Sequence, residues 1–150
     1  MRASLMSSHR KLNLLVVDDD PSITRLVSSY LSSALPDDVV ITTLNNPAEA
    51  QKWIQRHCCD LLISDIEMPG IDGLEMLRFA KGQNAWTQVV FLTGHSTWDR
   101  IAEAVEFGAS DYLLKPIDRE DLVSVITMVC SRIRRWQSAV LDTLRQPVTA

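Results

Sequence analysis

The chain contains 150 residues, of which 46% are hydrophobic and 23% are charged, and its formal net charge is −4. This composition is typical of one folded globular domain with room for a short extension, and it excludes an intrinsically disordered protein. The longest apolar runs have four or five residues, and residues 1–10 contain no apolar core of a secretory signal. Because a transmembrane helix needs roughly 20 apolar residues, we expect no membrane association and no secretion.

Five short β-type segments are spread along the chain, and most of them are continuously apolar rather than alternating. Such runs predict strands that are covered on both faces. The segments are Leu12–Val17, Val39–Leu44, Asp60–Ser64, Gln88–Leu92 and Asp111–Leu114.

Each of these segments is followed by a helix start signal and by apolar residues at helical spacing. Asp20-Pro21 and Asn46-Pro47 place a capping residue before a proline, which favours the first position of a helix. The remaining starts are predicted at Gly73, at Ser96 or Thr97 with a stop at Gly108, and at Asp118.

The alternation of five strands and five helices predicts an α/β fold with a parallel sheet, right-handed crossovers and helices on both faces. The expected architecture is the flavodoxin-like (βα)5 doubly wound sheet with strand order 2-1-3-4-5 and an extended C-terminal helix. In such folds, sites lie at the carboxyl ends of the strands, near the switch point between the first and third strands.

Reactive side chains stand where this topology requires them. Asp18 and Asp19 follow the first strand, Asp65 the third, Thr93 the fourth and Lys115 the fifth. Three converging carboxylates would repel one another, and Mg²⁺ removes that conflict because it prefers carboxylate oxygens and water. A carboxylate can accept a phosphoryl group, with Lys115 and Thr93 neutralising the phosphoryl oxygens. The sequence lacks a glycine-rich phosphate loop, which disfavours a nucleotide substrate.

Four stretches in this order resemble the receiver domain of two-component response regulators. They are residues 14–21 (LLVVDDDP), 60–73 (DLLISDIEMPGIDG), 89–94 (VVFLTG) and 108–116 (GASDYLLKP), and the resemblance covers about residues 11–131. It implies a cytoplasmic signalling switch that accepts a phosphoryl group from a histidine kinase or phosphotransfer protein. It also implies a protein that catalyses its own phosphotransfer and autodephosphorylation but is not a conventional enzyme.

The resemblance assigns roles to individual residues of this sequence. Asp65 would be the phosphoacceptor, Thr93 and Lys115 would contact the phosphoryl group, and Tyr112 would be the switch aromatic that follows Thr93. Asp19 would bind Mg²⁺ directly and Asp18 through water, with Asp65 and the backbone carbonyl of Glu67 completing the protein ligands. The Lys115–Pro116 bond is expected to be cis.

Two rival functions stay open. Asp18 and Asp20 have the spacing of an aspartyl-phosphate phosphohydrolase, although the later motifs and the absence of a cap domain disfavour it. A docking domain that is never phosphorylated is the second rival. For His95, a role near the incoming water or partner stands beside plain loop exposure, and Trp98 lies near the face that receivers use for partners.

The ends of the chain differ from its body in charge. Residues 11–131 carry 9 basic and 18 acidic side chains, whereas 132–150 carry 4 basic and 1 acidic. An acidic body binds nucleic acid poorly, and three tail arginines are too few to change that, so we expect no direct nucleic-acid binding. The three cysteines, Cys58, Cys59 and Cys130, show no ligand spacing and predict free thiols in a reducing, cytoplasmic compartment.

We divide the chain into a flexible leader (1–10), a receiver domain (11–131) and a helical extension (132–150). Within 122–144, apolar residues recur at spacings of three and four, interrupted by Gln137, which is a heptad pattern. One interpretation is a helix that frays after about Arg132. The other is a projecting helix that forms a homodimer or links to an output domain.

Overall fold

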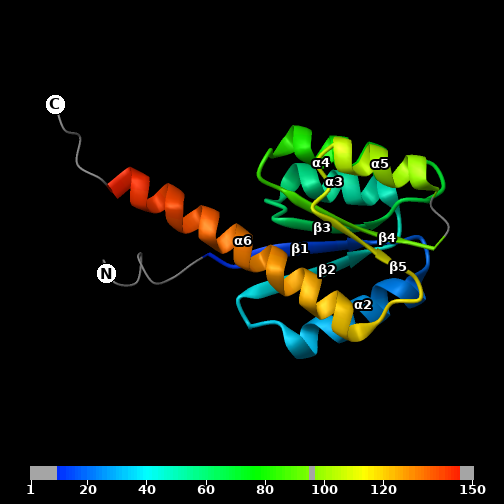
Figure 1. The fold of residues 1–150 in the computed structure, drawn as a ribbon, viewed down its shortest axis with the longest axis horizontal. Helices are drawn as coiled ribbons and strands as arrows, with labels where there is room; N and C mark the ends of the chain where they lie inside the picture. The colour runs from blue at the N-terminus through cyan, green and yellow to red at the C-terminus, as the bar shows by residue number, and fades with distance from the viewer. Residues whose placement is uncertain (1–9, 95–96, 146–150) are drawn as a thin grey trace.

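The structure is a computed structural model that describes residues 10–94 and 97–145, and its centre is a five-stranded parallel sheet (Figure 1). The strands are β1 (Leu12–Val17), β2 (Val39–Leu44), β3 (Leu61–Asp65), β4 (Gln88–Thr93) and β5 (Asp111–Leu114). Their order is β2-β1-β3-β4-β5, and every neighbouring pair is parallel. The predicted fold class and strand order are therefore confirmed.

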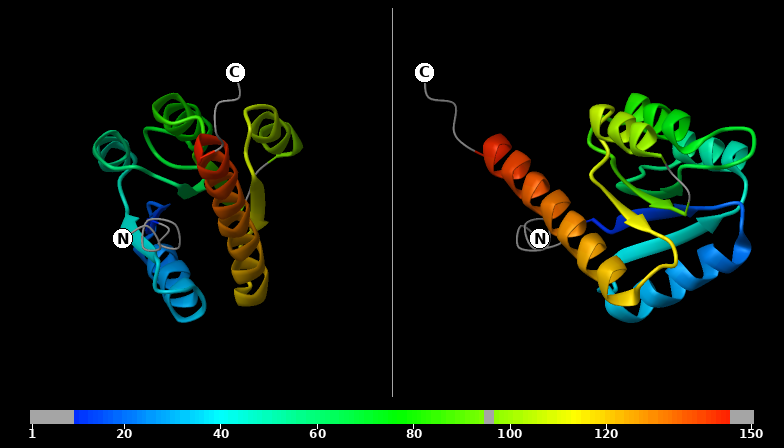
Figure 2. Two further views of the ribbon diagram at one scale, coloured as in Figure 1. Left: turned by 90° about the vertical axis from the view of Figure 1, so that its left-hand side faces the viewer. Right: turned by 45° about the vertical axis from the view of Figure 1, so that its right-hand side comes forward.

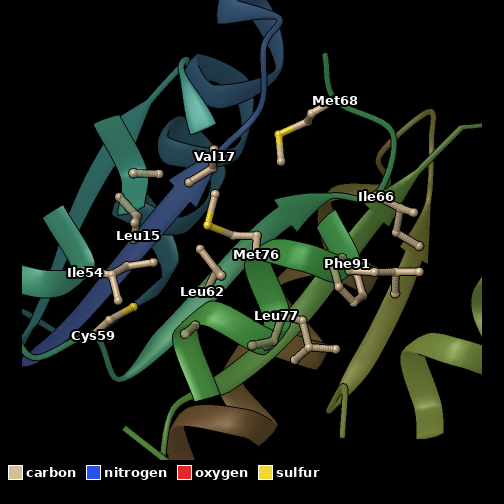
Figure 3. Packing of buried hydrophobic residues seen from close by; sticks show 14 of the residues in the cluster. Leu15, Val17, Ile54, Cys59, Leu62, Ile66, Met68, Met76, Leu77 and Phe91 are labelled. Atoms are coloured by element: carbon tan, nitrogen blue, oxygen red, sulfur yellow. The ribbon is translucent and has the colours of Figure 1, made fainter. Parts of the chain in front are cut away.

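Helices cover both faces of the sheet, as the continuous apolar strands require. They are α2 (Pro21–Ala34), α3 (Pro47–Arg56), α4 (Gly73–Gln83), α5 (Trp98–Glu106) and α6 (Arg119–Arg145). Successive residues of β1 point to opposite faces, so Leu15 and Val17 pack with α3 and α4, whereas Leu14 and Val16 pack with α2 and α6. Figure 3 shows the first of these two cores around Met76 and Phe91.

The helix starts follow the capping signals of the sequence. Asp20 accepts a hydrogen bond from the Ser22 amide, and Asn46 accepts from the amides of Ala48 and Glu49. Of the two candidates for the fourth helix, Thr97 is the cap that the structure describes. Gly108, with φ +94°, follows the end of that helix, which is the conformation that favours glycine after a helix.

Two strands end one residue later than the sequence predicts. β3 begins one residue later and ends on Asp65, which pairs with Leu92, and β4 ends on Thr93, which pairs with Leu114. In both parallel pairs, the paired residues include the polar residue that ends the strand. Asp65 and Thr93 are therefore fixed by the sheet and do not belong to the loops that follow it.

The last helix runs far beyond the sheet. α6 contains 27 residues and buries Leu122, Ile126, Val129 and Ile133 against the domain. Its later part projects away from the domain (Figures 1 and 2), and Val140, Leu141 and Leu144 are exposed. The predicted extended C-terminal helix is confirmed, because the helix continues without a break to Arg145 and does not end near Arg132.

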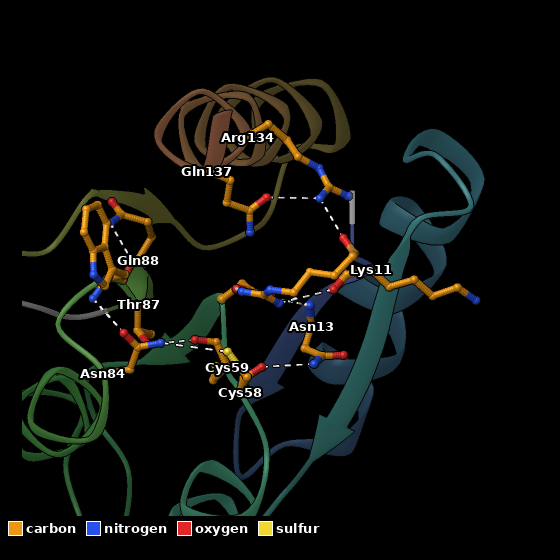
Figure 4. Close-up of polar contacts among 12 residues, drawn as sticks. Lys11, Asn13, Cys58, Cys59, Asn84, Thr87, Gln88, Arg134 and Gln137 are labelled. Atoms are coloured by element: carbon orange, nitrogen blue, oxygen red, sulfur yellow. Dashed lines mark hydrogen bonds and ion pairs between the residues drawn. The ribbon is translucent and has the colours of Figure 1, made fainter. Parts of the chain in front are cut away.

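Charged side chains fasten the middle of this helix to the amino edge of the sheet. Arg134 donates to the carbonyl oxygen of Arg10 (2.7 Å) and forms an ion pair with Asp38 (2.6 Å). Arg10 in turn pairs with both carboxylate oxygens of Asp60, whose Oδ2 also accepts from the Asn13 amide (2.8 Å). Figure 4 shows this edge, with Arg134 above Asn13. We name the set formed by Arg10, Asp38, Asp60 and Arg134 the amino-edge clasp.

None of the helices that the structure describes has the length and apolar character needed to cross a lipid bilayer. The expectation of a flexible leader at 1–10 falls almost wholly outside the described residues, of which Arg10 is the first.

Candidate functional site

Four strands bring polar side chains to the carboxyl edge of the sheet. Asp18 follows β1, Asp65 ends β3, Thr93 ends β4 and Lys115 follows β5. The ammonium group of Lys115 donates to Asp18 Oδ2 (2.8 Å) and to Asp65 Oδ2 (3.0 Å). The structure thus brings together residues that are up to 97 positions apart in the sequence.

Backbone amides orient the two buried carboxylates. The amide of Asp20 donates to Asp18 Oδ1 (2.9 Å), and the amide of Glu67 donates to Asp65 Oδ1 (3.1 Å). Asp18 is 1% exposed and Asp65 is 7% exposed. Each carboxylate therefore uses one oxygen for the backbone and shares the other with Lys115, which fixes the direction in which Asp65 presents its oxygens.

A close approach between α4 and β3 shapes the floor of this site. A Cβ on Gly73 would overlap the carbonyl oxygen of Asp65 and lie 2.6 Å from Cα of Ile66. The amide of Gly73 also donates to the carbonyl of Ile66 (2.8 Å). Only glycine lets the helix start this near to Asp65, so residue 73 is part of the architecture of the site.

Burial and Lys115 shift the pKa of Asp65 in opposite directions. Burial raises the pKa of Asp65, and the hydrogen bond and positive charge of Lys115 counter that shift only in part. For Lys115, burial lowers the pKa, but the hydrogen bonds to Asp18 and Asp65 outweigh it and leave the pKa above its ordinary value. The lysine is therefore held as a cation between two carboxylates.

A divalent cation fits the chemistry of this donor set. One carboxylate oxygen from each of Asp18, Asp19 and Asp65 can be chosen so that all three lie within 4.8 Å of one another. Lys115 supplies one positive charge against these three carboxylates. Hard oxygen donors with excess negative charge are the ligands that Mg²⁺ prefers, so the residues present fit the predicted metal.

Thr93 and Tyr112 lie at the side of the site that faces β5. Thr93 is fully buried, and its carbonyl oxygen accepts a hydrogen bond from the amide of Lys115 (2.8 Å). Tyr112, on β5, pairs in register with Phe91 of β4 and is 44% exposed. The Lys115–Pro116 bond is cis, as expected. His95 lies outside the described residues, whereas Trp98, at the start of α5, is 80% exposed.

Two residues near the site were not singled out by the sequence. Asn45, after β2, donates from its side chain to the carbonyl of Asp18 (2.9 Å) and to Thr24 Oγ1 (2.9 Å). Arg100, on α5, forms ion pairs with Glu67 and Asp72. Position at a strand end is a signal that could have found Asn45, but no sequence pattern marks Arg100.

Comparison with known proteins decides the family. The sequence model described as "Response regulator receiver domain" matches residues 14–127. The chain belongs to this family. The predicted resemblance is thereby confirmed.

Among curated relatives, the DNA-binding transcriptional regulator NtrC of Escherichia coli (strain K12) is 35% identical over 134 residues. NtrC of Klebsiella pneumoniae is 34% identical over 122 residues. The first match covers 89% of this chain but 28% of NtrC, so the chain spans little more than a quarter of the length of that relative.

Solved receiver structures share the fold over most of the chain. A receiver domain protein from Clostridium thermocellum superposes with a TM-score of 0.75 at 28% identity, covering 83% of this chain and 98% of that one. The chemotaxis protein CheY4 of Vibrio cholerae superposes with a TM-score of 0.71 at 29% identity, covering 79% and 98%. This receiver therefore has the family fold plus a C-terminal helix that continues beyond it.

Proposed function

We propose that Asp65 is the phosphoacceptor of this receiver and that the acidic edge holds Mg²⁺ during the transfer. The observation that supports the proposal is that Asp18 and Asp65 share Lys115 as a hydrogen-bond donor. Lys115 lies within hydrogen-bond distance of both Asp18 and Asp65, and a third carboxylate, Asp19, completes a cluster with excess negative charge. This arrangement has a nucleophile, a metal-ligand set and a cation in one place.

The chain's own residues prepare Asp65 for the transfer. The Glu67 amide holds Asp65 Oδ1, and the other oxygen, Oδ2, faces Lys115. An oxygen of Asp65 attacks phosphorus as the bond from phosphorus to the donor nitrogen of a phosphohistidine breaks, and the imidazole keeps the electron pair. Lys115 then neutralises charge on the phosphoryl oxygens, and the hydroxyl of Thr93 supplies a hydrogen bond.

Asp18, Asp19, Asp65 and the backbone carbonyl of Glu67 would hold the metal, with Asp18 acting through water. When bound, Mg²⁺ supplies positive charge against the phosphoryl oxygens. Because the reaction consumes one donor for each acceptor carboxylate, it is a stoichiometric switch and not turnover of an independent substrate. The donor proposed is a histidine kinase or a phosphotransfer protein.

Phosphorylation changes the surface on the β5 side of the site. Thr93 moves toward the new phosphoryl group, Tyr112 follows, and the surface formed by α5, β5 and α6 changes its preference for partners. This is a shift between two populations that the phosphoryl group stabilises unequally. Trp98 is fully available to a partner on this surface because it is 80% exposed.

The projecting part of α6 is proposed to connect this switch to its output, through a second copy of the chain or through an output domain. Its apolar residues Val140, Leu141 and Leu144 are exposed. Molar mass in solution, measured with and without Mg²⁺ and beryllofluoride, tests the first route. A mass of one chain under both conditions would exclude the homodimer. Residues 11–131 carry 18 acidic and 9 basic side chains, and this excess of acidic residues disfavours direct nucleic-acid binding. The free cysteines fit a cytoplasmic setting.

Substitution of the phosphoacceptor tests the function directly. With acetyl phosphate and Mg²⁺, the wild-type chain is expected to gain the mass of one phosphate, and Asp65→Asn is expected to gain none. The matched control is Asp20→Asn, because Asp20 is the fully exposed neighbour of the acidic pair and asparagine keeps its capping bond. Undiminished labelling of Asp65→Asn would refute the assignment.

The same preparations test the two rivals. Turnover of a generic phosphomonoester that is lost in Asp20→Asn would favour the phosphohydrolase. Failure of the wild-type chain to bind Mg²⁺ in a titration, together with no labelling, would favour a docking domain that is never phosphorylated. We expect Mg²⁺ binding that is lost in Asp19→Asn.

A further inference from the structure

Arg100 reaches from α5 across to the loop between β3 and α4. Its Nε lies 3.5 Å from Glu67 Oε1, and its Nη2 lies 3.3 Å from Asp72 Oδ2. The side chain is 29% exposed, and Nε is buried without a hydrogen bond among the described residues. The guanidinium is therefore held in place by charge, with both of its carboxylate partners in one loop.

Glu67 occupies a sensitive place in that loop. Its amide donates to Asp65 Oδ1 (3.1 Å), so the residue is attached to the carboxylate that is proposed to react. Its own side chain is 55% exposed, and the residue lies two positions after the end of β3, at the carboxyl edge of the sheet. A free negative charge at this position would stand beside the path by which a phosphoryl donor reaches Asp65.

Charge at this edge is unbalanced, and phosphoryl donors are anions. Lys115 forms ion pairs with Asp18 and Asp65, and the carboxylate of Asp19 lies close to both, so three carboxylates stand near one lysine. A fourth carboxylate without its own cation would add repulsion against an incoming dianion. At a hydrated entrance, one unit charge changes the rate of an anionic reactant by about threefold to tenfold, and salt reduces the effect.

We propose that Arg100 is a positioning residue that neutralises Glu67 and holds its carboxylate away from Asp65, so that an anionic phosphoryl donor reaches the acceptor. This inference rests on the proposed role of Asp65 and deepens it, since it identifies which charge at the site governs the rate. Arg100 touches neither the donor nor Asp65. Its effect on the rate is indirect and passes through the charge of Glu67.

Acetyl phosphate is the probe. An oxygen of Asp65 forms the bond to phosphorus as the bond between phosphorus and the acetate oxygen breaks, and acetate leaves with the electron pair. Arg100→Gln is expected to slow this reaction about threefold to tenfold at low salt, with a smaller deficit at high salt. Arg100→Lys keeps the charge and is expected to retain most of the rate.

Glu67→Gln provides the decisive partner variant. Because it removes the charge that Arg100 neutralises, the double variant Glu67→Gln with Arg100→Gln is expected to recover a rate close to that of the wild type. The matched control is Arg56→Gln, because Arg56 is an exposed arginine at the end of α3, and the part of the chain that the structure describes gives it no ion pair. It removes the same charge from the protein and is expected to change the rate less than about twofold.

Amide hydrogen exchange of metal-free protein supplies a readout that does not depend on phosphorylation. Arg100→Gln is expected to speed exchange in residues 66–72, and Arg56→Gln is not. An Arg100→Gln rate equal to or above that of the wild type, or a deficit that Glu67→Gln fails to rescue, would overturn the inference while the function of Asp65 stands. A wild-type chain that acetyl phosphate does not label on Asp65 overturns both.

Discussion

Two buried aspartates, at opposite ends of β3, differ in the balance of positive and negative charge around them. Asp60, just before β3, is paired through both oxygens with Arg10 and accepts a further bond from the Asn13 amide. Asp65, at the end of β3, shares Lys115 with Asp18 and lies close to Asp19. At the amino edge, acids and cations are matched. At the carboxyl edge, carboxylates outnumber the cation that they share.

This difference distinguishes an aspartate that stabilises the fold from one that is available to bind a ligand. A buried carboxylate whose oxygens are all occupied has nothing left to offer a ligand, and it stabilises the fold. A cluster with excess negative charge is unsatisfied until a metal or phosphoryl group completes it. Burial alone therefore does not mark a reactive aspartate, because both residues are buried. The balance of nearby charge is what distinguishes Asp65, the proposed phosphoacceptor, from Asp60.

The largest effect should come from crowding the carboxyl edge. Gly73→Ala places a methyl group against the backbone of Asp65 and Ile66, and we expect a loss of about 2 to 3 kcal/mol in the free energy of unfolding. Phosphorylation by acetyl phosphate should fall with it. Gly82→Ala, in the same helix, has open space around the new methyl group and should stabilise by about 0.5 to 1 kcal/mol. Urea denaturation compares the two, and equal effects would show that α4 does not press on the site.

A second test substitutes each of the two aspartates in turn and compares the effects on stability and on phosphorylation. Asp60→Ala leaves the Asn13 amide without its acceptor, and we expect a loss of about 2 kcal/mol in stability with Asp65 still phosphorylated. Asp65→Asn should abolish phosphorylation and leave the midpoint of urea denaturation close to that of the wild type. If Asp60→Ala abolished phosphorylation in the folded protein, the two edges would not be independent.

The smallest effect concerns pH. The pKa of Asp65 is raised in the folded protein, so the folded state binds the proton more tightly than the unfolded state. Stability of the metal-free wild type, relative to Asp65→Asn, should therefore rise as pH falls from about 7 to about 4. Urea denaturation of both proteins across this range measures the difference, and a decrease toward acid pH would mean that Lys115 outweighs burial.

Much of the fold and of the site could be predicted from local patterns. Buried parallel strands are continuously apolar, and helix starts carry capping residues such as Asp20 and Asn46, so element order and topology follow from short segments. The topology then places Asp18, Asp65 and Lys115 at one edge, because the carboxyl ends of parallel strands coincide.

Side-chain pairing between distant elements could not be predicted in this way. The bond between Arg134 and Asp38 joins residues 96 positions apart, and it depends on the direction in which α6 crosses the domain. Likewise, Arg100 meets Glu67 only because α5 packs beside α4. The need for glycine at position 73 arises from a helix-to-strand distance that no local pattern encodes.

Because α6 is long, a small rotation of the helix moves its far end over a larger distance than its near end. At about 1.5 Å per residue, the part of α6 from Arg134 to Arg145 is about 18 Å long. The amino-edge clasp holds the near end of that rod through Arg134. A rotation of about 10° about Arg134 would move Arg145 by about 3 Å. A small change in how α6 packs on the sheet would therefore produce a larger displacement at the far end of the helix.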